Sequence, residues 1–241
     1  MNLNAPPSWL FISNKGKTRE QNKDMYALIH NEDATLIIAF DISTSSPATT
    51  DITETFVNEV ESGLTNSSPS QVADVEQQLH LAFDKVKSEF KVGKASILVF
   101  CVLHRQVTIA CLHAGDVRLG QYSEGKAIQW ITNVHTGANA LGQFFEADML
   151  QNENRHIVTR CLNLQRSLNL ESTELERPEQ QQYLIVASDG FWAECSTEEQ
   201  IRLIKGEPHT TDDDCSAMVL TWNESNRLPS NNHDNLIVKF L

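Results

Sequence analysis

Apolar and polar residues alternate in blocks along the chain, and the apolar blocks predict most of its strands. Residues 34–40 (ATLIIAF) and 183–187 (YLIVA) form unbroken apolar runs, which are typical of central strands buried on both faces. Residues 95–103 and 107–114, joined by a short turn, predict a hairpin. Further strands are expected at 9–13, 25–29, 117–122, 127–131 and 235–241, and after the acids of TDDDCSAMVLTW.

Three stretches show the spacing of an amphipathic helix. The strongest runs from Val72 to Phe90, and Ser68 or Ser70 is expected to cap its start. Shorter helices are expected at 51–61 and 197–205. The remaining segments are predicted as helix and loop at 132–154, a short strand or helix at 156–162, and polar chain with little core-forming material at 165–182.

The order of these elements predicts an α+β fold. Strands grouped in hairpins, with helices between them, indicate antiparallel sheets. Neither an internal repeat nor a long linker divides the sequence, so we expect a single domain over residues 1–241.

Composition narrows the function classes. The chain has 241 residues and a net charge of −13, which argues against nucleic acid or an anionic membrane as a partner. Its N-terminus lacks the pattern of a signal peptide, and we expect a cytoplasmic protein. The five cysteines are far apart and predict reduced core residues. The eight histidines show no H-x-H or H-E-x-x-H spacing, so the sequence gives no support for a histidine-based metal site.

Four aspartates stand at the ends of apolar runs: Asp41, Asp116, Asp189 and Asp213. If those ends face one cleft, the carboxylates repel one another and need cations. Oxygen ligands suit Mg²⁺ or Mn²⁺, and such ions can activate a water as a nucleophile. The alternative is four unrelated turns, with Asp189 capping the helix that Ser196 or Thr197 starts.

Six motifs, in order, resemble those of the metal-dependent Ser/Thr protein phosphatases, the PPM or type 2C family, over nearly the whole chain. SDGFW at 188–192 matches without a mismatch. The other five are KGKTR at 15–19 with NKD at 22–24, DIS at 41–43, GDVR at 115–118, IVTRCL at 157–162 and DDCS at 213–216. The chain resembles a divergent, bacterial-type member of this family.

The resemblance implies a four-layer α-β-β-α sandwich with a two-metal site at one edge of two antiparallel sheets. Asp41 would bridge both metals, and Asp189 and Asp213 would hold the first. The carbonyl of Ile42 would face the second metal. The two remaining expected site residues are Arg19, which would bind the substrate phosphate, and Asp24, which would order metal-bound water.

Several residues depart from the family pattern. Lys23 stands where the family has an acid or amide. If its ammonium projects into the cleft, it would repel the second metal and pair with Asp41; the alternative is that Lys23 extends to solvent and leaves the site intact. Ile42 replaces a glycine, and Ala193 replaces an acid, so a third metal bound with Asp116 is not expected. Asp234 is an alternative to Asp213 as the closing metal ligand.

Two functions remain open on the sequence. The first is a divergent hydrolase that removes phosphate from phosphoserine or phosphothreonine in a signalling protein, with Mg²⁺ or Mn²⁺ as cofactor. The second is a weak or inactive pseudophosphatase that acts as a regulatory or binding module. In either case we expect a monomer, and the sequence does not name the substrate protein.

Overall fold

The structure is a computed structural model that describes residues 5–42, 50–105, 108–176, 178, 182–223, 228 and 231–241. The predicted loop that follows Ile42 lies almost entirely outside the described residues, as does Gln106 of the predicted hairpin turn.

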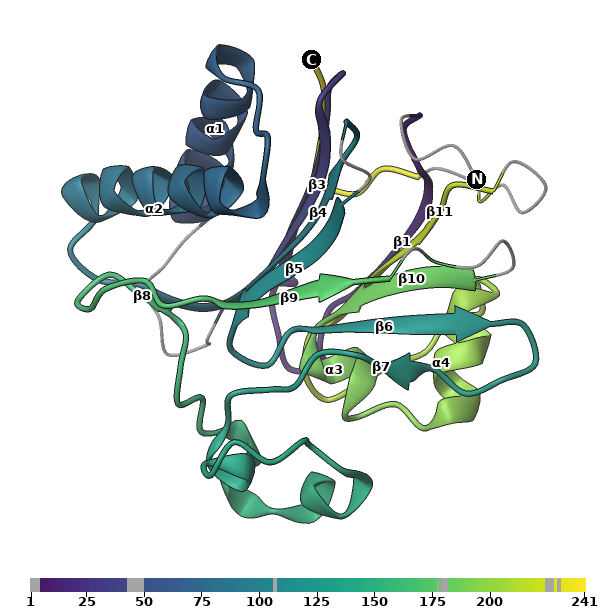
Figure 1. Cartoon of the computed structure of the whole chain (residues 1–241). Helices are drawn as coiled ribbons and strands as arrows, with labels where there is room; N and C mark the ends of the chain where they lie inside the picture. Colours follow the sequence, from purple (N-terminus) through teal and green to yellow (C-terminus); the bar gives the residue numbers. More distant parts are fainter. Residues whose placement is uncertain are drawn as a thin grey trace.

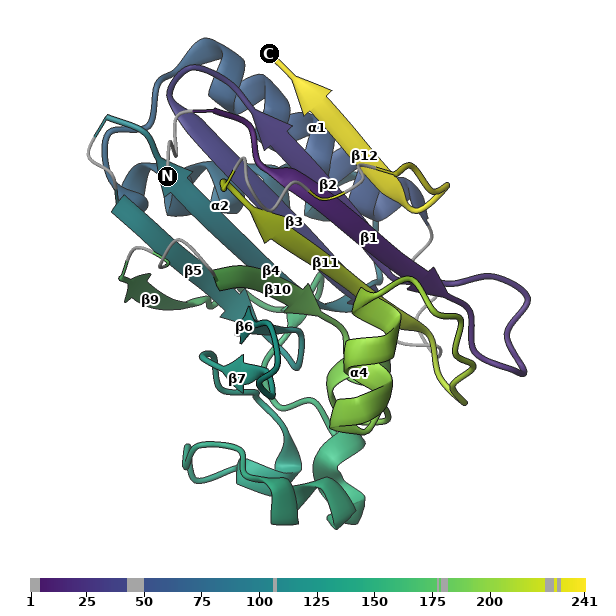
Figure 2. The same ribbon diagram turned by 90° about the vertical axis from the view of Figure 1, so that its right-hand side faces the viewer.

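Two sheets make up the centre of the molecule (Figures 1 and 2). The first contains, in spatial order, β1 (Ser8–Asn14), β11 (Cys215–Thr221), β10 (Gln182–Ala187), β6 (Arg118–Ser123) and β7 (Gln129–Trp130). The second contains β12 (Leu236–Phe240), β2 (Met25–His30), β3 (Ala34–Ile42), β4 (Lys94–Leu103), β5 (Thr108–Ala114) and β9 (Glu171–Leu175), and β8 (Leu162–Asn163) also pairs with β4. The predicted central positions of the apolar strands β3 and β10 are confirmed.

Helices cover the outer faces of both sheets. In Figure 1, α1 (Thr50–Asn66) and α2 (Val72–Glu89) lie against the sheet that holds β3, β4 and β5. On the far side, α3 (Asp189–Trp192) and α4 (Thr197–Ile204) lie beside β10 and β6. The predicted α+β class, with sheets flanked by helices, is therefore confirmed.

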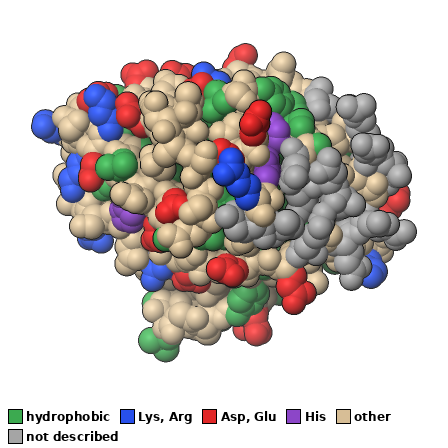
Figure 3. Space-filling view, turned by 45° about the horizontal axis from the view of Figure 1, so that its top comes forward, with side chains coloured by type: hydrophobic (Ala, Val, Ile, Leu, Met, Phe, Trp, Pro, Cys, Tyr) green, Lys and Arg blue, Asp and Glu red, His purple; other side chains and the backbone are tan. Residues whose placement is uncertain are grey.

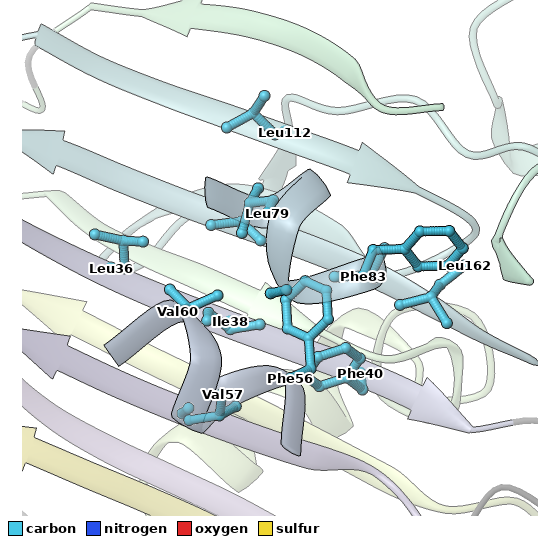
Figure 4. Close-up of a cluster of buried hydrophobic side chains, with 14 of the residues drawn as sticks. Leu36, Ile38, Phe40, Phe56, Val57, Val60, Leu79, Phe83, Leu112 and Leu162 are labelled. Atoms are coloured by element: carbon cyan, nitrogen blue, oxygen red, sulfur yellow. The ribbon is translucent and has the colours of Figure 1, made fainter. Parts of the chain in front are cut away.

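Three hydrophobic clusters join these four layers. The cluster between α1, α2 and the larger sheet includes Phe56, Phe83 and Ile38, which are close to fully buried (Figure 4). A second cluster fills the space between the sheets, and a third packs α3 and α4 on the smaller sheet. Residues of one strand thus alternate between clusters: Ile37 belongs to the cluster between the sheets and Ile38 to the cluster under the helices. This is why β3 is apolar at every position.

Several local expectations are wrong. The start of α2 is capped by neither Ser68 nor Ser70: Gln71 is the N-cap residue, and Asp74 accepts its backbone N–H. Strand β9 lies inside the segment 165–182, where little core-forming material was expected. The sequence does not indicate this strand because its alternate residues are exposed and it pairs only with β5. Strand β12 pairs with β2 in parallel, the one exception to antiparallel pairing among the described strands.

The segment between β7 and β8 contains three short 3-10 helices: η1 (Gly137–Asn139), η2 (Ala147–Gln151) and η3 (Glu153–His156). They project from the end of the sandwich where β3 and β10 finish (Figure 1). No residue of η2 or η3 is buried. This explains why the segment carries no clear apolar period in the sequence.

The surface is mixed in character. On the face shown in Figure 3, acidic and basic side chains are scattered among uncharged ones. All five cysteines are described, and all are free thiols, with Cys161 partly exposed and the others buried. None of the described helices combines the length and apolarity needed to cross a membrane.

Candidate active site

A cavity of about 710 Å³ opens at the end of the sandwich where β3 and β10 finish. Five carboxylates line it: Asp41, Asp116, Asp189, Asp213 and Asp214. Arg19 and Ile42 line the same cavity. The structure therefore brings together five of the six expected site residues, and the sixth, Asp24, lies behind them.

Each of the main carboxylates is delivered by a central strand. Asp41 is the penultimate residue of β3, and Asp189 follows the end of β10 and starts α3. Asp213 lies just before β11, which pairs with β10. Because these strands are buried, the three side chains have little freedom to move apart.

Two glycines of the recognised motifs bring neighbouring segments together. A Cβ on Gly190 would overlap the carbonyl oxygen of Asp214, so only glycine lets α3 lie this close to the start of β11. Gly16 is in a similar but less crowded position, where a Cβ would overlap the backbone of Asp212 and Asp213. These contacts place Asp189 and Arg19 next to Asp213.

Burial and mutual repulsion raise the pKa values of these acids. Burial is the main cause for Asp41 and Asp189, and the charges of neighbouring carboxylates add to it. Asp24 is 2% exposed, and burial raises its pKa to about 8. A group of acids held in this state is stabilised by added cations.

Two arginines already supply positive charge. Nη2 of Arg19 lies 2.6 Å from Oδ1 of Asp213, and Nη1 of Arg155 lies 3.7 Å from Oδ2 of Asp189. Asp41 differs, because its carboxylate has neither a hydrogen bond nor an ion pair among the described residues. Asp41 is thus the acid most in need of a cation.

Asp214 has a different environment. Its Oδ1 accepts a hydrogen bond from the backbone of Gly16, and its Oδ2 accepts one from the backbone of Lys23, both at 2.9 Å. It ties the 16–23 loop to β11. The sequence analysis used Asp214 only as part of a motif, and nothing in the local pattern distinguishes its role from that of Asp213.

Asp24, Lys23 and Asp234 line a neighbouring cavity of about 800 Å³, which shares Ile42 with the first. The hydroxyl of Ser188 donates to Oδ2 of Asp24 at 2.7 Å. The expected pairing of Lys23 with Asp41 is wrong: both residues are described, and no ion pair joins them. The backbone bond from Lys23 to Asp214 directs the chain so that its side chain lines the second cavity. Asp234 lies in that second cavity, apart from the five carboxylates.

Comparison with known proteins gives structural matches only. No family model matches the sequence, and no curated protein matches it significantly. Among solved structures, the PPM Ser-Thr phosphatase MsPP from Mycobacterium smegmatis, in complex with cacodylate, has a TM-score of 0.69 at 15% identity, with 90% of this chain and 98% of that chain covered. The phosphatase Stp1 from Staphylococcus aureus also has a TM-score of 0.69 at 15% identity, with coverages of 92% and 97%.

This chain has the fold of the PPM phosphatases. Another structure with this fold is the catalytic domain of the phosphatase PstP in complex with two manganese ions, with a TM-score of 0.61 at 14% identity and coverages of 89% and 97%.

The donor set of this chain fits divalent cations. Five carboxylates and Ile42 line one cavity, and oxygen donors such as carboxylates are those that Mg²⁺ and Mn²⁺ prefer. Burial and neighbouring carboxylates raise the pKa values of Asp41 and Asp189, and a bound cation would offset both effects.

The cavity is also lined by basic residues that were not predicted as site residues. They are Lys94, Arg160, Arg166 and His156. Arg160 belongs to the IVTRCL motif, but no motif or spacing in the sequence points to Lys94 or Arg166 as site residues. Strand β8 brings them there by pairing with the start of β4.

Proposed function

We propose that the protein is a divergent member of the PPM family and a metal-dependent protein Ser/Thr phosphatase. The observation that carries this proposal is the arrival of three carboxylates in one cavity: Asp41 from the end of β3 in one sheet, and Asp189, after β10, and Asp213, before β11, from the other. A fold alone does not establish an activity, so the argument rests on this cavity.

In this proposal Asp41, Asp189 and Asp213 hold the metals, with the carbonyl of Ile42. Bound Mg²⁺ or Mn²⁺ would supply the positive charge that activates a water and neutralises a phosphoryl group. Asp213 is preferred to Asp234 because only Asp213 lines the cavity with Asp41.

Arg19 is proposed to bind the substrate phosphate. Its guanidinium already lines the cavity, and its present contact with Asp213 holds it beside the carboxylates. A planar guanidinium can donate paired hydrogen bonds to a phosphoryl group. If Asp213 held a metal, the Arg19 donor now paired with it would be available to the substrate phosphate.

Asp24 is proposed to order a metal-bound water from behind the metal ligands. Its carboxyl is buried and lies close enough to Asp41 for its charge to raise the pKa of Asp41. With its own pKa raised to about 8, it holds a proton over part of the neutral range. It can therefore donate or accept a hydrogen bond at the site.

The basic residues of the cavity fit a phosphoprotein substrate. Lys94, Arg160 and Arg166 line the cavity that a dianionic phosphate would enter, whereas the remainder of a chain of net charge −13 would repel it. We propose that the substrate is a phosphoserine or phosphothreonine side chain on a protein, and that the chain acts as a monomeric, single-domain cytoplasmic enzyme.

A second candidate is a pseudophosphatase that binds phosphoproteins without hydrolysing them. Two observations favour it: Lys23 stands where the family has an acid or amide, and two of the carboxylates are already paired with arginines. Hydrolysis of a phosphoester dye and of a phosphothreonine peptide, measured with and without Mn²⁺, separates the two. Mn²⁺-dependent turnover of both substrates supports the enzyme, and binding of the peptide without turnover supports the pseudophosphatase.

A further inference from the structure

A second cluster of metal-binding side chains lies outside the carboxylate cavity. His113 is on β5, Glu171 is directly opposite it on β9, and His135 comes from the segment after β7. One donor atom from each of the three lies within 4.8 Å of the other two. The cluster does not depend on the proposed phosphatase activity.

His113 has an unusual environment. It is 0% exposed, and neither of its ring nitrogens makes a hydrogen bond of good geometry among the described residues; the backbone of Asn133 lies near enough to act on the pKa of His113 but does not complete such a bond. Leaving a buried polar group without a partner is destabilising, so such a group calls for an explanation. An ion bound to one nitrogen would supply the missing partner.

The other two side chains are placed beside this ring. The ring of His135 stacks on that of His113, with centroids 4.8 Å apart, and Nε2 of His135 lies 3.0 Å from Oε2 of Glu171. The side chain of Glu171 is 44% exposed, which leaves a path from solvent and room for a water as a further ligand. Zinc sites built from two histidines and one glutamate have this composition.

The protonation states suit a metal. Burial lowers the pKa of His113 to about 4, so its ring is neutral near pH 7, and burial also lowers the pKa of His135. The hydrogen bond from His135 lowers the pKa of Glu171, so its carboxylate is charged. Neutral imidazoles and an ionised carboxylate are the forms that bind metals.

We propose that His113, His135 and Glu171 bind a transition-metal ion, with Zn²⁺ as the ion that best matches two imidazoles and one carboxylate.

Binding has a defined local cost. In the structure the backbone N–H of Gly115 donates to Nδ1 of His135 at 3.1 Å, which places the ring proton on Nε2. An ion at Nε2 moves that proton to Nδ1, and the bond from Gly115 is lost. Gly115 precedes Asp116, one of the cavity carboxylates, so Zn²⁺ binding would be linked to the aspartate cavity. Arg160, 3.4 Å from Oε2 of Glu171, leaves Oε1 for the ion.

The test uses the full chain and Zn²⁺ itself. Isothermal titration with Zn²⁺ in millimolar Mg²⁺ compares wild type, Glu171→Gln and the matched control Glu174→Gln, which changes an exposed residue of the same strand. We expect Glu171→Gln to weaken the site at least about tenfold. Glu174→Gln should leave it unchanged. Equal affinities for wild type and Glu171→Gln would overturn the proposal.

Two further variants separate this site from the carboxylate cavity. His113→Leu removes a ligand and keeps an apolar side chain in the core, so it should fold and lose the Zn²⁺-dependent rise in Tm. Co²⁺ used in place of Zn²⁺ gives strong visible absorption when it is four-coordinate. Asp189→Asn should keep both this absorption and the Zn²⁺-dependent rise in Tm. If Asp189→Asn abolishes these signals while Glu171→Gln retains them, the ion is bound by the cavity and the proposal is wrong.

Discussion

The carboxylate cavity and the His113 cluster are both arranged to attract cations, but they do so by different means. The cavity gathers charged groups that repel one another, and burial raises their pKa values. The cluster gathers neutral imidazoles beside one carboxylate, and burial lowers the histidine pKa values. The cavity therefore needs charge from a cation, whereas the cluster needs a partner for a buried nitrogen.

The position of each group explains this difference. The aspartates lie at strand ends, where side chains face an open cavity. His113 is also the penultimate residue of its strand, β5, but it is 0% exposed and lines neither of the two cavities. The same fold thus produces a site suited to hard, oxygen-preferring ions and a site suited to ions that prefer nitrogen.

Removing a cavity carboxylate should have the largest effect. We expect Asp189→Asn to lower Mn²⁺-dependent hydrolysis at least about 100-fold, because a metal ligand held on a buried strand is lost. Asp213→Asn should have a comparable effect, and the matched change Asp234→Asn, in the second cavity, should have little. Steady-state kinetics over a Mn²⁺ series measure this. A large loss in Asp234→Asn with none in Asp213→Asn would reverse the assignment of the closing ligand.

The pH dependence of stability should separate the two regions by sign. Asp24 ionises near pH 3.8 when unfolded but at about pH 8 when folded, so the folded state binds more protons in that range and its stability falls as pH rises. His113 titrates near pH 6.5 when unfolded and about pH 4 when folded, so its contribution to stability rises over that range.

Between pH 6.5 and 8 the contribution of His113 no longer changes with pH, so of these two groups only Asp24 alters the stability. Metal-free protein should then lose stability as pH rises, with a fall in Tm of several degrees, about 2–4 °C for each kcal/mol. Calorimetry of wild type, Asp24→Asn and His113→Leu without metal measures this. The fall should be reduced in Asp24→Asn and preserved in His113→Leu. A Tm in wild type that rises over this interval would contradict the assignment.

Arg155 allows a smaller change in the charge of the cavity. Its guanidinium lies 3.7 Å from Asp189 and competes with a metal for that carboxylate. We expect Arg155→Gln to raise Mn²⁺ affinity a few-fold, because it removes a positive charge that competes for Asp189. Titration calorimetry measures this affinity. The control is Arg202→Gln, because Arg202 pairs with Glu207 and neither residue lines the cavity. Weaker Mn²⁺ binding in Arg155→Gln would show that the arginine supports the site.

Lys23 should have the smallest effect. Because its side chain lines the neighbouring cavity without pairing to Asp41, Lys23→Glu should raise Mn²⁺ affinity and hydrolysis by less than about tenfold, through solvent-screened charge. Parallel titration and dye hydrolysis, with Lys15→Glu as a second charge reversal on the same cavity, measure it. Equal gains in both variants indicate a general field effect, and a gain of 100-fold in Lys23→Glu alone would place Lys23 at the second metal position.

Much of the fold and of the carboxylate site was determined by the sequence itself. Central strands such as β3 must be apolar at every position because both of their faces are buried, and this pattern is visible without coordinates. Asp41 and Asp189 stand out because each follows such a run, and Gly190 marks the close approach beside them. Local sequence determines these features because strand and turn are local structures.

Tertiary structure alone decided the rest. Asp213 and Asp214 are neighbours with similar local sequence, and only the position of the 16–23 loop gives backbone donors to Asp214 and leaves Asp213 facing the cavity. Lys23 is directed to the second cavity by the same contact. The members of the His113 cluster come from three separate segments with no motif spacing, and β9 is too exposed to be recognised as a strand. They meet because β5 and β9 pair, and long-range strand pairing leaves no signature in the local order of residues.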